Sequence, residues 1–77
     1  METKHQILEH VVSNSSQVKA IKYNTDTKEL DVQFVNTGKW YRYYDVLLST
    51  YEAFKAAPSA GIFLNTQIKG KYSYKAL

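Results

Sequence analysis

The stretch Trp40 to Asp45, with the sequence WYRYYD, decides the fold expected for this chain because aromatic residues stand on both sides of one arginine. In a β-strand, successive side chains point to opposite faces of the sheet. Tyr41 and Tyr43 therefore share one face, which we expect to join a core. The side chains on the other face, which is open to a ligand, are those of Trp40, Arg42 and Tyr44.

Two further strands are predicted before this stretch, which itself forms a third. Residues 18–23 and 30–36 alternate apolar and polar side chains, and residues 40–46 return as the third strand. Turn residues fill 24–28, and the segment 36–38 ends in a glycine that can adopt the positive φ of a tight hairpin. The pattern predicts an antiparallel meander that needs a cover on one face.

A helix over residues 47–57 is expected to supply part of that cover. We expect Asp45 to cap this helix, because its carboxylate can accept hydrogen bonds from the first free N–H groups. Pro58 forbids continuation. The apolar stripe of the helix consists of Leu47, Tyr51 and Phe54.

A second short helix follows at once. Ser59 is its expected cap, and it is expected to run to about residue 68. Gly61 is expected to allow close helix packing, and Gly70 suits the left-handed residue just past a helix end. The apolar residues of this helix are Phe63, Leu64 and Ile68.

The two terminal segments leave alternatives open. Residues 3–12 have apolar side chains at helical spacing, and Thr3 with Gln6 has the form of a capping box. A strand ending at Val12 competes, because β-branched residues precede a polar break at 13–16. The basic, aromatic tail 71–77 pairs as a strand, wraps over the helices or stays disordered.

The fold class predicted from these elements is α+β. It is a three-stranded antiparallel meander, with an extra N- or C-terminal strand as an alternative, covered on one face by two short helices. The 77 residues make one domain, with residues 1–12 as a variable N-terminal extension and 71–77 as a tail. A domain of this size buries only about 60 to 65% of its unfolded surface, so its core is small.

Composition narrows the expected compartment. The chain has no cysteine, which excludes disulfides and thiolate metal sites and favours a reducing environment. No segment approaches the roughly 20 apolar residues that span a bilayer, and the first ten residues do not resemble a secretion signal. We expect a soluble, cytoplasmic protein with no membrane partner.

Charge is distributed unevenly along the chain. Residues 1–52 carry all seven acidic residues and six basic ones, whereas residues 53–77 carry four lysines and no acid. This positive pole indicates an anionic partner such as nucleic acid, a phosphate-bearing ligand or an acidic protein surface. The alternative is a solvated lysine face that only aids solubility.

Enzyme activity finds little support. His5 and His10 fall off a common helical face and have no metal-ligand spacing with nearby carboxylates. There is no glycine-rich phosphate loop, and no histidine lies in the middle of the chain to act as a base. We expect no catalytic residue, no metal and no cofactor.

In this order the motifs resemble the KTSC family over about residues 13–75. The residues that carry the likeness in the first two strands are Ser15, Ser16, Ile21, Tyr23, Leu30, Val32 and Phe34. The Y-x-Y signature of the family is matched by Tyr41, Arg42 and Tyr43, followed by Asp45, Val46 and Tyr51. Its S-x-G-x-aromatic-x-N stretch is matched by Ser59, Gly61, Phe63 and Asn65, followed by Ile68 and Tyr72.

The resemblance implies a small domain found at the C-terminus of some lysyl-tRNA synthetases and as single-domain bacterial and phage proteins. It suggests RNA binding through the synthetase context. Two departures stand out: Leu47 replaces a frequent proline, and the arginine near the last tyrosines is replaced by lysines at 69, 71 and 75. Lysine lacks the bidentate fork with which arginine recognises phosphate.

Two groups of candidate ligand-binding residues result. On the outer sheet face, Trp40, Arg42 and Tyr44 beside Lys22 form an aromatic and cationic surface on which bases can stack. The alternatives for this face are cross-strand support and a dimer interface. The second group, in and near the tail, is Asn65, Lys69, Lys71 and Tyr74. Asn65 either bonds a ligand or ties the second helix to a strand.

The function predicted first is a non-catalytic module that binds RNA or another nucleotide-type anion through these surfaces. A second hypothesis is a small homo-oligomer, encoded by a phage or bacterium, that sequesters a small phosphorylated nucleotide. A third is a protein-interaction domain that uses the exposed sheet or its edge strand.

Overall fold

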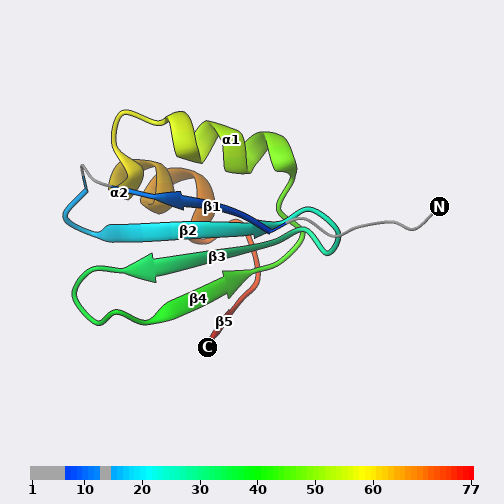
Figure 1. The fold of residues 1–77 in the computed structure, drawn as a ribbon, viewed down its shortest axis with the longest axis horizontal. Coiled ribbons are helices and arrows are strands. Elements are labelled where there is room, and N and C mark those ends of the chain that lie inside the picture. Colours follow the sequence, from blue (N-terminus) through cyan, green and yellow to red (C-terminus); the bar gives the residue numbers. More distant parts are fainter. Residues whose placement is uncertain (1–6, 13–14) are drawn as a thin grey trace.

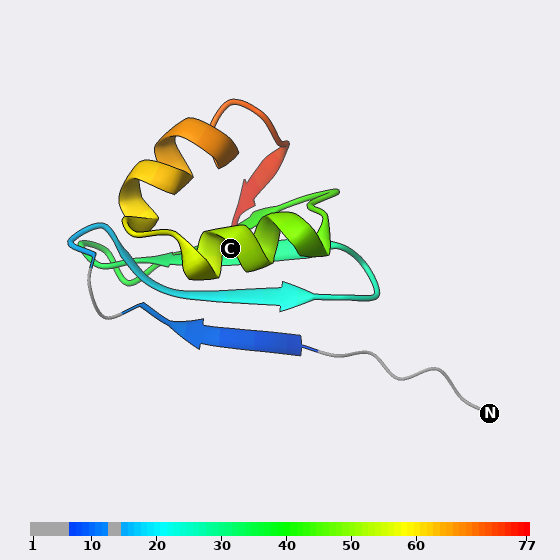
Figure 2. The ribbon, with the colours of Figure 1, turned by 90° about the horizontal axis from the view of Figure 1, so that it is seen from above.

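A five-stranded antiparallel sheet with helices on one face is seen in the computed structural model, which describes residues 7–12 and 15–77 (Figures 1 and 2). The strands neighbour one another in chain order: β1 (Ile7–Val11), β2 (Val18–Asn24), β3 (Glu29–Phe34), β4 (Trp40–Tyr43) and β5 (Tyr74–Ala76). Between β4 and β5 lie α1 (Leu48–Ala56) and a second helix made of α2 (Ala60–Phe63) and the π-helical η1 (Leu64–Ile68). The α+β class is confirmed, but the sheet has five strands rather than three.

Both terminal segments contribute edge strands, which settles the alternatives left open by the sequence. β1 pairs with β2, and the backbone N–H of Val12 donates to the carbonyl of Lys19 at 2.9 Å. β5 pairs with β4, and the N–H of Leu77 donates to the carbonyl of Trp40 at 2.9 Å. The capping box predicted at Thr3 and Gln6 lies outside the described residues.

The two predicted hairpin turns form as the turn residues indicate. Between β2 and β3, Asn24 Oδ1 accepts the N–H of Asp26 at 2.9 Å, and Lys28 takes a positive φ of 61°. Between β3 and β4, Gly38 has φ 69° and its N–H donates to the carbonyl of Phe34 at 2.9 Å. The strands end earlier than predicted, at Phe34 and Tyr43.

The core lies between the sheet and the helices. Tyr23 stacks on Tyr51 with a centroid distance of 5.3 Å, and its hydroxyl donates to the carbonyl of Val46. Phe54 of α1 stacks on Phe63 of the second helix at 5.0 Å. The buried apolar residues are Val18, Ile21, Tyr23, Leu30, Val32, Tyr43, Val46, Tyr51, Phe54, Ala60, Leu64 and Ile68. None of the helices in the described ranges has the length and apolar character needed to cross a membrane.

The start of α1 differs from the prediction. Asp45 has φ 59° and makes a left-handed turn, while Leu47 occupies the cap position without a side-chain hydrogen bond. The next residue, Val46, is buried, and its N–H donates to the carbonyl of Lys28 at 2.9 Å. This anchoring requires a sharp turn at Asp45, so its carboxylate does not cap the helix. Leu47 is exposed, so the apolar stripe is reduced to the buried Tyr51 and Phe54.

The second helix docks through the serine, glycine and asparagine predicted from its sequence. Ser59 Oγ accepts the N–H of Ile62 at 3.3 Å, which confirms the predicted cap. Gly61 is buried, and a Cβ atom built there would lie 2.6 Å from Gln17 Oε1. The same oxygen accepts a hydrogen bond from Asn65 Nδ2 at 3.3 Å. Gly61 therefore permits close packing, and Asn65 ties the helix to the segment before β2.

Candidate ligand-binding site

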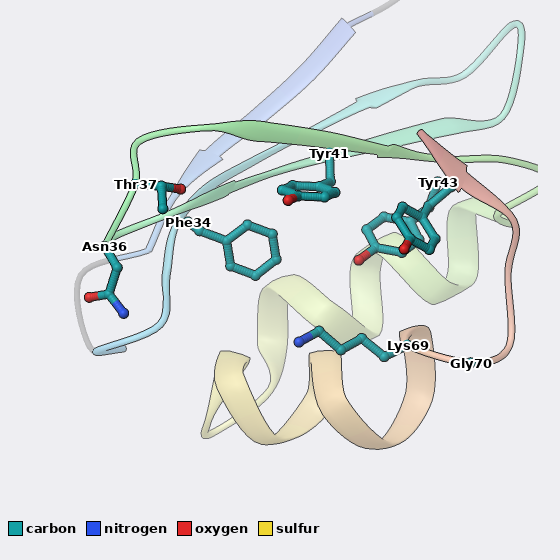
Figure 3. A pocket seen from close by; sticks show the side chains of 8 residues that line it. Phe34, Asn36, Thr37, Tyr41, Tyr43, Lys69 and Gly70 are labelled. Carbon is teal, nitrogen blue, oxygen red and sulfur yellow. The ribbon is translucent and has the colours of Figure 1, made fainter. Parts of the chain in front are cut away.

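A cavity opens between the inner face of the sheet and the end of the second helix (Figure 3). Its volume is about 550 Å³, within the range of about 300 to 1,000 Å³ typical of small-ligand sites. The residues that line it are Phe34, Asn36, Thr37, Tyr41, Tyr43, Lys69, Gly70 and Tyr74. No acidic residue is among them.

The sheet side of the cavity is aromatic. The ring of Tyr41 meets Phe34 edge-on, with centroids 5.3 Å apart. Tyr74 of β5 lies 5.9 Å from Tyr41 and 5.8 Å from Tyr43, with tilted rings. This arrangement follows from the register, in which Tyr43 opposes Tyr74 and Tyr41 opposes Ala76. The cavity thus offers ring faces in several orientations to a planar ligand.

Lys69 supplies the positive charge from the helix side. The π-helix η1 ends just before Lys69, whose backbone N–H donates to the carbonyl of Leu64 at 2.8 Å. Short π-helical segments are frequent at functional sites. Gly70 then reverses the chain with φ 79°, as predicted. Figure 3 shows the Lys69 side chain extending toward Phe34, and its Nζ lies 5.7 Å from the Phe34 ring centroid.

The position of Tyr43 beside this cavity changes the pKa of its phenol. Burial raises the pKa of Tyr43 above its ordinary value, and the neighbouring phenols of Tyr74 and Tyr41 raise this pKa further. The hydroxyl is therefore protonated at neutral pH and presents an O–H donor. The core phenols of Tyr23 and Tyr51 also have a raised pKa, chiefly because of burial.

The outer face of the sheet holds the first predicted group. Lys22 Nζ lies 4.8 Å from the Trp40 ring centroid, a cation–π contact across the sheet. Arg42 donates from Nε to Asp31 Oδ1 at 2.9 Å and from Nη2 to Asp31 Oδ2 at 3.1 Å, and Glu29 lies 3.7 Å away. The hydrogen bond to Asp31 raises the pKa of the Arg42 guanidinium.

Strand register extends this ion pair into a row of charges. The cross-strand partners across all five strands are Glu9, Lys22, Asp31, Arg42 and Lys75. Directly opposed residues share one face of a sheet. Acidic and basic side chains alternate along most of this row, so much of the positive charge of the outer face is already offset.

Sequence comparison places the chain in a family. A model of the KTSC domain matches residues 14–72. The chain belongs to the KTSC domain family. A KTSC domain protein from Yersinia pestis, solved by crystallography, superposes with a TM-score of 0.85 at 32% identity, covering 94% of this chain and 99% of that one.

Two relatives with assigned names are lysine–tRNA ligases, from Trichormus variabilis and from a Nostoc species. Each is 36% identical to this KTSC domain over 62 residues, which is 80% of this chain. The chain spans 11% of the length of each of them.

The fold of this KTSC domain distributes the predicted site residues over four places. Lys69 and Tyr74 line the cavity. Asn65 bonds Gln17, as in the structural alternative. Lys71 is exposed in the turn before β5, where its N–H donates to the carbonyl of Ile68 at 3.1 Å. The residues on or beside the outer face are Trp40, Arg42, Lys22 and Tyr44; Tyr44 follows β4 and its N–H donates to Ser73 at 3.0 Å.

Sequence reasoning missed the cavity residues of the inner face. Phe34, Tyr41 and Tyr43 are correctly predicted as inward-facing, but the helices leave one end of that face open instead of covering it. The alternation of lysine and tyrosine in the tail is the signal that pointed to this region. Among the described residues, no group of three or more His, Cys, Asp or Glu side chains is placed to hold a metal ion.

Proposed function

We propose that this KTSC domain is a non-catalytic binding module that holds a nucleotide-type anion, an RNA nucleotide first of all, in the cavity between η1 and the β4–β5 pair. The observation that carries the proposal is the position of Lys69 at an aromatic cavity whose lining, within the described part of the chain, includes no acidic residue. A ligand that satisfies both features has a flat ring and a negative charge.

The aromatic residues provide stacking surfaces for the ring. Tyr74 is 63% exposed, and Tyr41 is half-buried, so both rings are within reach of a ligand that enters from solvent. Stacking of a base on an aromatic side chain contributes about 1–3 kcal/mol and tolerates any base. This supports recognition of a nucleotide without strong base selectivity from stacking alone.

The ammonium of Lys69 is available to a phosphate. The Lys69 ammonium lies over the Phe34 ring, and within residues 7–12 and 15–77 no carboxylate lies within ion-pair distance of it. Arg42 differs, because Asp31 already accepts two hydrogen bonds from it. The electrostatics therefore favour the cavity over the outer face as the anion site.

The similarity to two lysine–tRNA ligases favours RNA among nucleotide-bearing partners. The cavity volume of about 550 Å³ equally supports a single free nucleotide. The sequestering function, in which a small homo-oligomer removes a phosphorylated nucleotide from circulation, uses the same residues. Light scattering combined with thermal shifts over a nucleotide panel separates the two: a monomer without any shift rejects sequestration.

The direct test is a titration of labelled single-stranded RNA at about 50 mM and about 200 mM salt. Lys69→Gln is expected to weaken binding about 5-fold or more at low salt and to lower the salt slope by about 0.7. Lys71→Gln is the matched control, because it removes an exposed lysine two residues away that does not line the cavity. Equal affinities for the wild type and Lys69→Gln reject this site, and binding that is absent or indifferent to salt rejects RNA as the ligand.

A further inference from the structure

The hydroxyl of Tyr43 has an unusual position for a core tyrosine. The residue is only 3% exposed, yet no described residue exchanges a hydrogen bond with this hydroxyl. Tyr23, which is 1% exposed on the neighbouring part of the core, instead donates to the carbonyl of Val46. Two tyrosines of similar burial thus differ in whether the protein itself uses their O–H group.

The Tyr43 oxygen faces the cavity. Among the described residues, no side-chain nitrogen or oxygen is both sealed from solvent and without a partner. Since Tyr43 lines the cavity and its oxygen has no partner among residues 7–12 and 15–77, that oxygen must open onto the cavity. Figure 3 shows Tyr43 on the sheet side and Lys69 on the helix side of the same space.

Because this hydroxyl opens onto the cavity, water satisfies it when the cavity is empty, and an acceptor atom of a bound molecule can replace that water. A phenylalanine at this position would keep the ring packing but would present no donor to the cavity. The hydroxyl therefore fits a role toward a molecule in the cavity better than a role in folding.

We infer that the Tyr43 hydroxyl donates a hydrogen bond to a ring acceptor of the ligand, so that the cavity selects a nucleobase over an aromatic ring without polar edge atoms. This rests on the proposed function and adds the orientation of the ligand. The base lies inward at the 3%-exposed Tyr43, and the phosphate lies outward at the exposed Lys69. The ligand class is a nucleoside monophosphate or one nucleotide of a single strand.

The substitution that tests this inference is Tyr43→Phe, with Tyr23→Phe as the matched control. Tyr43→Phe is expected to leave the melting temperature unchanged or raise it, because no protein hydrogen bond is lost. Tyr23→Phe is expected to lower it by about 4–8 °C, because the carbonyl of Val46 loses its donor. Equal losses in the two variants would show a structural role for the Tyr43 hydroxyl and overturn the inference without any ligand.

Calorimetric titrations with AMP, UMP and phenyl phosphate complete the test. Tyr43→Phe is expected to weaken AMP or UMP about 5- to 10-fold, which corresponds to about one neutral hydrogen bond. Its affinity for phenyl phosphate, which has no ring acceptor, is expected to stay that of the wild type.

The outcomes distinguish the inference from the function on which it rests. If the wild type binds the nucleotides and Tyr43→Phe binds them equally well, the inference is wrong and the proposed function stands. If the wild type binds none of the three probes and no single-stranded RNA, both are wrong.

Discussion

Arg42 forms a two-pronged ion pair with Asp31, its direct cross-strand partner, with nitrogen–oxygen distances of 2.9 and 3.1 Å. Two nitrogens of this arginine therefore already donate hydrogen bonds within the sheet. In the structure Arg42 is part of a cross-strand row of charges, which favours the cavity on the opposite face as the candidate site.

The Arg42–Asp31 pair predicts a measurable coupling free energy between the two side chains. Arg42 is 35% and Asp31 16% exposed in their side chains, so solvent screens the pair in part. A double-mutant cycle of Arg42→Ala and Asp31→Ala, followed by urea unfolding, is expected to give a coupling of about 0.5–1 kcal/mol. A 5-fold or greater loss of nucleotide affinity in Arg42→Ala would contradict the structural role and return the site to the outer face.

Two positions of the second helix, Ile62 and Leu64, are expected to differ sharply in the stability cost of an alanine substitution. Leu64 is completely buried, whereas Ile62 is 64% exposed. Leu64→Ala is expected to cost about 2–4 kcal/mol in the free energy of unfolding, and Ile62→Ala less than about 0.5 kcal/mol. A small domain has only about 5 kcal/mol or somewhat more in total, so Leu64→Ala is expected to show a population of unfolded chains by circular dichroism. Equal costs at the two positions would mean that the second helix does not dock as described.

The helix contact at Gly61 predicts non-additive effects. A methyl group at Gly61 must displace the end of the Gln17 side chain, which then releases Asn65. Gly61→Ala also gains up to about 1 kcal/mol of helix propensity, so its net effect on stability is expected to be small. Asn65→Ala is expected to destabilise the wild type by about 0.5–1 kcal/mol but to have little effect on top of Gly61→Ala. Additive losses would show that Gln17 and Asn65 do not act together.

The raised pKa values of three tyrosines predict that the folded protein becomes less stable at alkaline pH. The pKa values of Tyr23, Tyr43 and Tyr51 are raised in the folded protein, mainly by burial. Above about pH 10 the unfolded chain loses these protons while the folded protein keeps them, so the free energy of unfolding falls as the pH rises. Below the pKa of the unfolded chain this contribution is fully present and constant.

Urea unfolding between about pH 8 and pH 11, monitored together with phenolate absorbance, checks this. Three of the seven tyrosines are expected to ionise only as the structure is lost. Tyr51→Phe is expected to make the decline with pH less steep. A pH-independent stability through this range contradicts the assignment.

Local sequence was sufficient for much of the fold. Alternation in residues 18–23 and 30–36 predicts the strands and their buried faces, because a side-chain period of two allows only one register with Val32 and Leu30 inside. Ser59, Gly38 and Gly70 mark the helix cap and the positive-φ positions through their own chemistry. The predicted helix cap at Asp45 was wrong because its side chain is compatible with two local roles, a cap and a left-handed turn. Burial of the next residue, Val46, requires the turn.

The amino-acid sequence by itself determined the strand faces, the two hairpins, the cap of the second helix and the inward direction of Tyr41 and Tyr43, since each depends on short-range periodicity or backbone conformation. Only the tertiary structure decided that β5 pairs with β4 and brings Tyr74 and Lys69 to the open end of the inner face. It also decided that Arg42 meets Asp31. These outcomes depend on which distant segments become neighbours, and that is set by the packing of the helices on the sheet rather than by any local pattern.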